Sequence, residues 1–231
     1  MKIRQVTALY YSATGTTRTV VCRAAEAAAR VLNVPWREVS FTTPGERAAQ
    51  LNFADGDLVI CGSPTYAGRL PNKLAPEFRA KWQGNGAAAV AVVTFGNRAF
   101  DNSLAELTDL LKQNGFRVLG AGAFVCRHAF TDALAADRPN SDDLALAEEL
   151  GAAAAEKAAS DAPGADVSVP GNPEAPYYIP RGVDGAPAKF LPAKAQVKRE
   201  LCTGCGRCVA KCPIHMNIVK VMKTLAKGEK Q

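Results

Sequence analysis

Short apolar runs alternate with amphipathic or alanine-rich segments along roughly the first 160 residues of the chain. This pattern is typical of a parallel sheet with crossover helices, because strands that are buried on both faces carry apolar side chains at nearly every position. The expected strands cover residues 3–10, 36–39, 57–61, 87–95 and 117–125, and the expected helices cover 15–32, 71–81, 103–114 and about 141–160. The pattern predicts an α/β fold built on a doubly wound, parallel, five-stranded sheet.

The composition changes after Asp161, and the change predicts three parts in the chain. Seven prolines fall between Pro163 and Pro192, interleaved with glycine and alanine. Such a stretch is typical of an extended linker or strap rather than of a packed unit. We therefore expect an α/β domain over residues 1–160, a linker over 161–195 and a small segment over 196–231.

Four of the seven cysteines lie close together in this last segment: Cys202, Cys205, Cys208 and Cys212. Their spacing, C-x2-C-x2-C-x3-C followed by proline, is the run that binds an iron–sulfur cubane in bacterial ferredoxins. Zinc is the alternative, but structural zinc sites usually separate two cysteine pairs by a longer segment. The run predicts a 4Fe-4S cluster and a redox function.

The identity of the fourth cluster ligand stays open. In two-cluster ferredoxins the fourth cysteine of a run ligates the other cluster, and this chain holds a single run. Cys212 closes the same cluster, or the first three cysteines hold it with a non-protein ligand or as a three-iron form, or the chain is shortened and its cluster labile. His215 is a weaker candidate ligand. Cys22, Cys61 and Cys126 lie in the α/β domain, where nothing in their pattern requires a ligand role.

A hydroxyl-rich turn, Y-Y-S-A-T-G-T-T at positions 10–17, follows the first predicted strand. It matches neither G-x-G-x-x-G nor a nucleotide P-loop. Free backbone N–H groups at the following helix start, the helix dipole and a glycine for close approach suit a phosphate. The turn holds no lysine or arginine, so we expect a phosphate monoester bound mainly by neutral donors. The candidate binding residues are Ser12, Ala13, Thr14, Gly15, Thr16 and Thr17.

Two further loops leave the carboxyl ends of predicted strands, where open parallel sheets bind ligands. They read G-S-P-T-Y-A-G-R-L-P at 62–71 and T-F-G-N-R-A-F-D-N at 94–102. Tyr66 offers an aromatic face to a flat ring system, and Gly68 permits a close backbone approach. Asn97 and Arg98 offer hydrogen bonds to polar atoms of such a ring. The candidates here are Pro64, Thr65, Tyr66, Gly68, Thr94, Gly96, Asn97 and Arg98.

These motifs together resemble a known family. S-x-T-G-T-T after the first strand is similar to the flavodoxin phosphate loop, and the alternating pattern is similar to the flavodoxin fold. The later loops, with G-A-F-V-C-R-H-A-F at 122–130 and R-P-N-S-D-D-L at 138–144, resemble bacterial proteins that fuse a flavodoxin-like domain to a C-terminal ferredoxin-like domain. The resemblance implies FMN bound non-covalently at the three loops. Such fusions usually carry two cysteine runs, and this chain departs from them in having one.

Composition and charge narrow the choice of partner and location. The chain has 231 residues, of which 48% are hydrophobic and 22% charged, as in an ordinary globular protein. No apolar run approaches the roughly 20 residues of a membrane span, and the stretch 6–11 is too short for a signal-peptide core. We expect a cytoplasmic protein. The net charge of +6 comes largely from the tail after Lys194. This favours a solvated tail or an acidic redox partner over nucleic acid, and it leaves the oligomeric state undefined.

Three functions are compatible with the sequence. The first is an electron carrier, in which FMN and the cluster interconvert two-electron and one-electron chemistry. The second is an FMN-dependent reductase of a small substrate such as a quinone, flavin or metal complex, with His128 or Tyr66 as proton donor. The third is a non-redox binding module with a zinc-bound tail. We favour the carrier, assign no catalytic residue, and rank the third function last because the three loops keep the chemistry of a flavin site.

Overall fold

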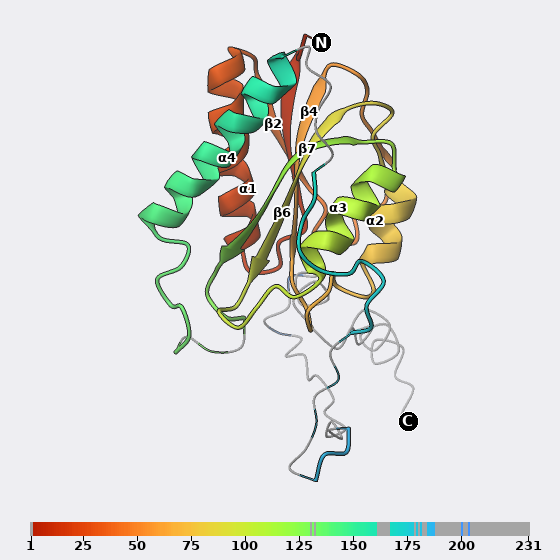
Figure 1. Ribbon diagram of the computed structural model, residues 1–231, viewed down its shortest axis with the longest axis vertical. Helices are drawn as coiled ribbons and strands as arrows, with labels where there is room; N and C mark the ends of the chain where they lie inside the picture. The colour runs from red at the N-terminus through yellow and green to blue at the C-terminus, as the bar shows by residue number, and fades with distance from the viewer. Residues whose placement is uncertain are drawn as a thin grey trace.

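The computed structural model describes residues 2–129, 131, 133–160, 167–177, 179, 181, 184–187, 200 and 203. Five strands form one parallel sheet in the order β2-β1-β4-β6-β7 (Figure 1). Counted in chain order, these strands have the 2-1-3-4-5 arrangement of the flavodoxin-like doubly wound folds. The predicted fold class is confirmed. The strands are β1 (Gln5–Tyr10), β2 (Trp36–Ser40), β4 (Asp57–Pro64), β6 (Ala88–Phe95) and β7 (Arg117–Val125).

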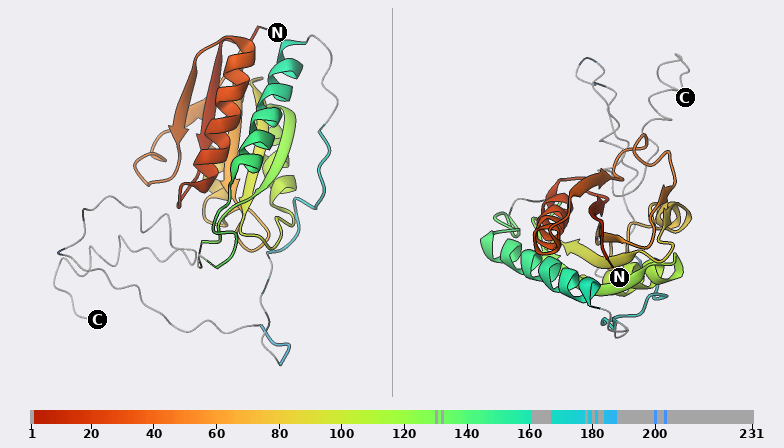
Figure 2. Two further views of the ribbon diagram at one scale, coloured as in Figure 1. Left: turned by 90° about the vertical axis from the view of Figure 1, so that its left-hand side faces the viewer. Right: turned by 90° about the horizontal axis from the view of Figure 1, so that it is seen from above.

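Helices cover both faces of the sheet, and each face has its own apolar core (Figure 2). One core lies under α1 (Thr16–Leu32) and α4 (Ser141–Ala159), and the other lies under α2 (Ala75–Lys81) and α3 (Ser103–Gln113). The central strands β4 and β6 are buried along almost their whole length, as a strand covered on both faces must be.

A second, two-stranded parallel sheet was not predicted. It pairs β3 (Leu51–Asn52) with β5 (Trp82–Gln83), and two-residue strands are too short to leave a periodic signal. Its main contribution is aromatic packing, because the Trp82 ring stacks on Phe78 at a centroid distance of 4.2 Å and meets Phe41 edge-on at 5.5 Å. The pattern predicted that a helix starts near Pro71, but α2 begins at Ala75. Residues 71–74 form a turn instead, in which the N–H groups of Leu74 and Ala75 donate to the Pro71 carbonyl.

The start of α4 agrees with the prediction. Asn140 accepts hydrogen bonds from the backbone N–H groups of Asp142 and Asp143, and the Asp143 carboxylate accepts one from the Asn140 N–H in return. Arg138 forms an ion pair with Asp143, and this pair holds the pKa of that carboxyl below its ordinary value. The capping box fixes where the chain leaves the loop after β7 and enters the helix.

Helices α1 and α4 approach each other closely at a glycine. A Cβ atom added to Gly151 would lie 2.0 Å from the backbone carbonyl oxygen of Ala24, a contact that side-chain movement cannot relieve. The buried residues of α1 and α4 around this crossing are largely alanines, so the helix pair depends on small side chains for its spacing.

We expect Gly151→Ala to destabilise the domain although alanine is the better helix former. The propensity gain is about 1 kcal/mol, whereas forcing an extra methyl into a tight core costs about 1–3 kcal/mol or more. A net loss of about 1–2 kcal/mol should appear in urea-induced unfolding. Gly45→Ala is the control, since a Cβ there meets no atom within 4 Å, and equal stability of both variants would contradict the packing argument.

Part of the predicted linker packs against the domain. Residues 167–177 run along α3, and Val167 and Val169 pack against the second core (Figure 1). The sequence predicted an extended linker or strap here, and composition does not indicate whether such a segment packs against a surface. The boundaries 161–195 and 196–231 stay predictions. Among the described residues, none of the helices combines the length and the apolar character needed to cross a membrane.

Candidate functional site

The phosphate-loop candidates lie between the end of β1 and the start of α1. Gly15 is the N-cap of α1 in a left-handed conformation (φ 93°), and a Cβ there would meet nothing within 4 Å. Within the described part of the chain, the N-cap glycine offers no side chain to the helix, Ser12 Oγ accepts from the N–H of Arg18, and no acidic residue lies in the first turn. The N–H groups of Thr16 and Thr17 therefore keep their capacity to bind an anion, and the glycine leaves room for one.

The loop hydroxyls divide into surface and buried groups. Thr14 and Thr16 lie 3.5 Å apart, measured between their Oγ1 atoms, on the accessible side of the turn. Ser12 Oγ accepts from the N–H of Arg18 (3.0 Å) and so holds the turn closed against the helix. Thr17 is 2% exposed, and its hydroxyl bonds Thr94 Oγ1 at 2.7 Å. Thr17 and Thr94 thus connect the start of α1 to the end of β6 through a buried hydrogen bond.

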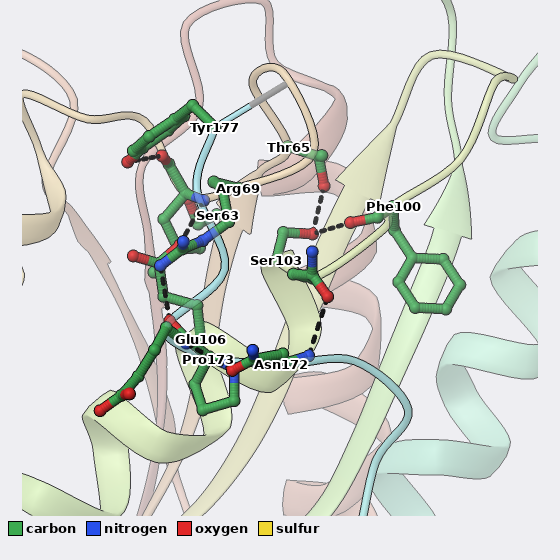
Figure 3. A network of polar contacts seen from close by, with 12 residues as sticks. Ser63, Thr65, Arg69, Phe100, Ser103, Glu106, Asn172, Pro173 and Tyr177 are labelled. Carbon is green, nitrogen blue, oxygen red and sulfur yellow. Dashed lines mark hydrogen bonds and ion pairs between the residues drawn. The ribbon is translucent and has the colours of Figure 1, made fainter. Parts of the chain in front are cut away.

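The second and third loops are bonded to each other at the same edge of the sheet. The Thr65 N–H donates to the Thr94 carbonyl (2.8 Å), and Thr65 Oγ1 lies 2.6 Å from Ser103 Oγ (Figure 3). The N–H of Asn102 donates to the Gly68 carbonyl (2.9 Å). These bonds fix the two loops as one unit beside the turn at Gly15.

Two glycines in these loops are required by close neighbours. A Cβ on Gly68, which has φ 79°, would lie 2.6 Å from an Asp101 carboxylate oxygen, and a Cβ on Gly96 would lie 2.6 Å from the His128 ring. Arg98 is exposed and forms an ion pair with Asp101. The loop after β7 therefore reaches the third loop through His128, which places this histidine at the candidate site.

Of the other candidates, Tyr66 is half-buried against the second core, and Pro64 ends β4 beside it. Asn97 is exposed and takes a left-handed backbone (φ 64°) at the tip of the third loop. All fourteen predicted cofactor-binding positions thus lie on three loops at the carboxyl edge of β1, β4 and β6 or on the adjoining ends of the elements, with Pro64 and Thr94 in strands and Thr16 and Thr17 in α1. This edge is the switch point at which the chain order of the strands reverses.

A polar cavity of about 490 Å³ opens on the β2 side of the first loop. It contains predicted residues, Ser12 to Gly15, but its lining includes none from the second or third loop. The remaining lining residues were not singled out by the sequence and come from the end of β1, the first turn of α1, β2 and the loop after β2: Tyr10, Arg18, Glu38, Ser40, Thr42, Thr43 and Glu46.

The cavity lining carries one positive and two negative side chains, Arg18 against Glu38 and Glu46, and the arginine is already paired. Arg18 forms a bidentate ion pair with Glu38, in which one guanidinium nitrogen lies 2.9 Å from Oε2. Tyr10 donates its hydroxyl proton to the same carboxylate. Arg18 keeps the pKa of Glu38 below its ordinary value, whereas burial and then Glu38 raise the pKa of Tyr10. Because the arginine has a carboxylate partner, the turn presents mainly neutral donors, as expected.

The loop after β2 supports the first loop directly. Thr42 Oγ1 accepts from the N–H of Ser12 (3.0 Å), and Glu46 accepts from the N–H groups of Thr42 (3.1 Å) and Thr43 (2.6 Å). Thr42, Thr43 and Glu46 belong to the site only through this long-range contact, in which thirty positions separate Ser12 from Thr42. A sequence pattern contains no signal for such a contact.

The three cysteines of the α/β domain are protonated at neutral pH. Burial is the main cause for each, and it raises the pKa of Cys22 to about 11, raises that of Cys126 to about 12 and raises that of Cys61 further. Metal ligation requires a thiolate. No group of three or more His, Cys, Asp or Glu side chains suited to a metal occurs among the described residues. The cysteines predicted to bind the cluster, 202, 205, 208 and 212, lie outside those residues.

A comparison with known families identifies the C-terminal segment. Residues 195–216 match the family described as 4Fe-4S binding domain, which confirms the predicted iron–sulfur segment. Among curated proteins no match is found. The strand order and helix layers define the N-terminal part as a flavodoxin-like α/β domain. The chain as a whole is consistent with a fusion of such a domain to a 4Fe-4S segment.

Several solved structures have a similar fold at low identity. A flavodoxin from the domain Archaea is 16% identical, with 67% of this chain and 98% of that chain covered and a TM-score of 0.46. The Megasphaera elsdenii flavodoxin in its two-electron reduced form is 16% identical, with 65% and 98% covered and a TM-score of 0.45. Rubredoxin oxygen:oxidoreductase from Desulfovibrio gigas is 16% identical, with 68% and 37% covered and a TM-score of 0.46. The fold assignment above rests on strand order instead.

Proposed function

We propose that this protein is an electron carrier that couples a bound FMN to a 4Fe-4S cluster. The observation that carries the proposal is the presence, in one chain, of a 4Fe-4S binding segment and a 2-1-3-4-5 sheet with a glycine-capped helix start at its switch point. A flavin accepts two electrons and releases them singly, and a cluster takes one at a time. Joining the two allows conversion between two-electron and one-electron partners.

The residues of the first loop suit the phosphate of FMN. The N–H groups at the start of α1 and the hydroxyls of Thr14 and Thr16 supply neutral donors, and Gly15 leaves space beside them. In this proposal Ser12 and Thr17 also hold the loop in place, because Ser12 Oγ accepts from the N–H of Arg18 and the Thr17 hydroxyl bonds Thr94 in the interior. Tyr66, Asn97 and Arg98 would flank the ring from the other two loops.

The test is a cofactor count under anaerobic conditions. The full chain, reconstituted with FMN, ferrous iron and sulfide, should bind one FMN and about four irons and four sulfides, and its reduced cluster should give an electron paramagnetic resonance signal. Cys202→Ser is the matched variant and should lose the iron while keeping the flavin. A protein that binds zinc and no iron, or that ignores FMN, would overturn the proposal.

The reductase is the second candidate, and His128 favours it, because its ring packs against Gly96 in the third loop. The two functions differ in what they need. A reductase would turn over a quinone or a flavin at a rate that falls in His128→Ala and survives in Cys202→Ser. A carrier would lose its activity with the cluster. The cytoplasmic location and an acidic redox partner belong to this proposal as expectations.

A further inference from the structure

A segment of the predicted linker, residues 167–177, crosses the domain from one edge of the sheet to the other; we name it the strap. Helix α4 ends at the amino edge, where Lys157 Nζ donates to the carbonyl of Leu119 near the start of β7. The strap then runs antiparallel to α3. Lys112, near the end of that helix, donates to the Val167 carbonyl (3.1 Å). Asn102, at its start, accepts from the Asn172 N–H (2.8 Å). The strap therefore returns the chain to the carboxyl edge, as Figures 1 and 2 show.

The strap is anchored there by a buried ion pair (Figure 3). Arg69 Nε lies 2.8 Å from Glu106 Oε2, and the two side chains are 8% and 3% exposed. The other end of the Arg69 fork donates to the carbonyl of Pro173 (2.6 Å), and its Cζ lies 5.3 Å from the centroid of the Tyr177 ring. Tyr177 donates its hydroxyl proton to the Leu70 carbonyl (2.8 Å). One arginine thus joins α3, the loop after β4 and the strap.

A buried guanidinium needs an acceptor for each of its buried N–H groups, because an unpaired one carries the full cost of desolvation. Glu106 Oε2 accepts both from Arg69 and from the N–H of Leu70 (2.8 Å), so this oxygen already has two donors. The Pro173 carbonyl supplies a further acceptor, and it comes from the strap. The strap therefore lowers the desolvation cost of burying the Arg69 guanidinium.

The same anchor belongs to a candidate flavin loop. The Tyr66 N–H donates to the Arg69 carbonyl (2.8 Å), and the Arg69 N–H donates to the Tyr66 carbonyl (3.2 Å). Asn102 contacts both the Tyr66 loop and the strap, since its N–H donates to the Gly68 carbonyl and its side chain accepts from the Asn172 N–H. Two residues thus link the strap directly to the loop that carries Tyr66.

We propose that Arg69 is a positioning residue that locks the strap to the Tyr66 loop, so that the chain leaves for its iron–sulfur segment from the flavin edge. This inference rests on the proposed function. Without the lock, the tether to the first cluster cysteine would start at the end of α4, and 42 positions separate Ser160 from Cys202. With the lock, the tether starts at Tyr177, and 25 positions separate it from Cys202. A shorter tether that starts beside its target raises the effective concentration of the cluster at the flavin.

Hydrogen exchange in the full chain without cofactors tests the lock itself. Arg69→Lys keeps the charge beside Glu106 but replaces the two-ended fork by a single ammonium, so the contact to Pro173 should be lost. We expect the N–H groups of Asn172 and Ala175 to exchange at least about tenfold faster, the factor that corresponds to one lost hydrogen bond from a charged group. Unchanged exchange of these groups would overturn the lock.

Two further variants separate the lock from general damage. Arg181→Lys changes an arginine further along the same connector, whose described contact is to the nearby Gly185 carbonyl (2.7 Å), and it should leave the strap unaffected. Tyr177→Phe leaves the ion pair intact and removes only the hydroxyl bond to Leu70, so exchange should rise by about fivefold. If Arg69→Lys disturbs β6 as well, the comparison between the strap and β6 decides, and exchange at Asn172 and Ala175 that rises no more than exchange in β6 contradicts the proposal.

Electron transfer in the reconstituted protein tests the consequence. After photoreduction of the flavin by a deazaflavin with a sacrificial amine, one electron should pass from the reduced flavin to the oxidised cluster. We expect the transfer to be about tenfold slower in Arg69→Lys, with the FMN affinity measured separately by titration. Faster strap exchange with an unchanged transfer rate would overturn the positioning role and leave the proposed function intact. A wild-type chain that binds neither cofactor would overturn both, whatever the exchange data.

Discussion

Replacing Thr16 with glutamate is expected to abolish FMN binding while leaving the fold intact. Thr16 is the first residue of α1, where a carboxylate suits the helix dipole and should not destabilise the protein. The same carboxylate would face the phosphate that the turn is proposed to hold. Two unit charges near contact repel each other by about 4 kcal/mol at a protein surface, which predicts a loss of at least about 100-fold in affinity. Fluorescence titration of FMN measures this directly.

The control for this variant is Thr16→Gln, which has nearly the same size and no charge. It should weaken FMN binding far less than the glutamate does, and both variants should unfold at the denaturant concentration of the parent protein. Equal affinity of Thr16→Glu and Thr16→Gln would show that no phosphate lies at the start of α1. The first-loop assignment would then be wrong.

Removing one partner of the buried ion pair should cause a large loss of stability. In Glu106→Ala the Arg69 guanidinium would stay buried without its carboxylate, and the Leu70 N–H would lose its acceptor. Breaking a buried pair in this way costs about 3–5 kcal/mol. The exposed pair of Arg23 and Glu148, whose side chains are 42% and 35% exposed, offers a matched comparison, because Glu148→Ala should cost less than about 1 kcal/mol.

Denaturant unfolding of the two alanine variants measures the contrast. The double variant Arg69→Met with Glu106→Leu removes both charges and should recover part of the loss, although the Leu70 N–H still lacks its partner. A cost below about 1 kcal/mol for Glu106→Ala would mean that water or other groups satisfy Arg69. The pair would then not be the anchor described above.

The sheet was predictable because its strands carry a strong and simple signal. The runs that became β4 and β6 are apolar at almost every position, and such runs are expected only where helices cover both faces. The start of α4 was equally readable from Asn140 and the acidic residues after it. The paired strands β3 and β5 were not predicted, because each has two residues and so short a segment shows no hydrophobic periodicity.

The candidate site was predictable only in outline. Parallel strands bring their carboxyl ends to one edge, and this rule alone gathers the three loops. Sequence motifs did not reveal that Thr17 and Thr94 bond each other in the interior, or that Glu38 engages Arg18. Such contacts join residues that are tens of positions apart. The same reason explains the strap, because its prolines predicted an extended backbone while its anchor, Arg69, lies a hundred residues earlier.

Charge transfer between the two cofactors within a single molecule is the most direct test of the account. The full chain, reconstituted anaerobically with FMN, iron and sulfide, would be given electrons through its flavin at high dilution. The account predicts that the flavin loses its electron to the cluster in a step whose rate does not depend on protein concentration, with the cluster signal in electron paramagnetic resonance rising as the flavin absorbance recovers. A flavin that stays reduced beside an oxidised cluster, or that reacts only between molecules, would contradict it.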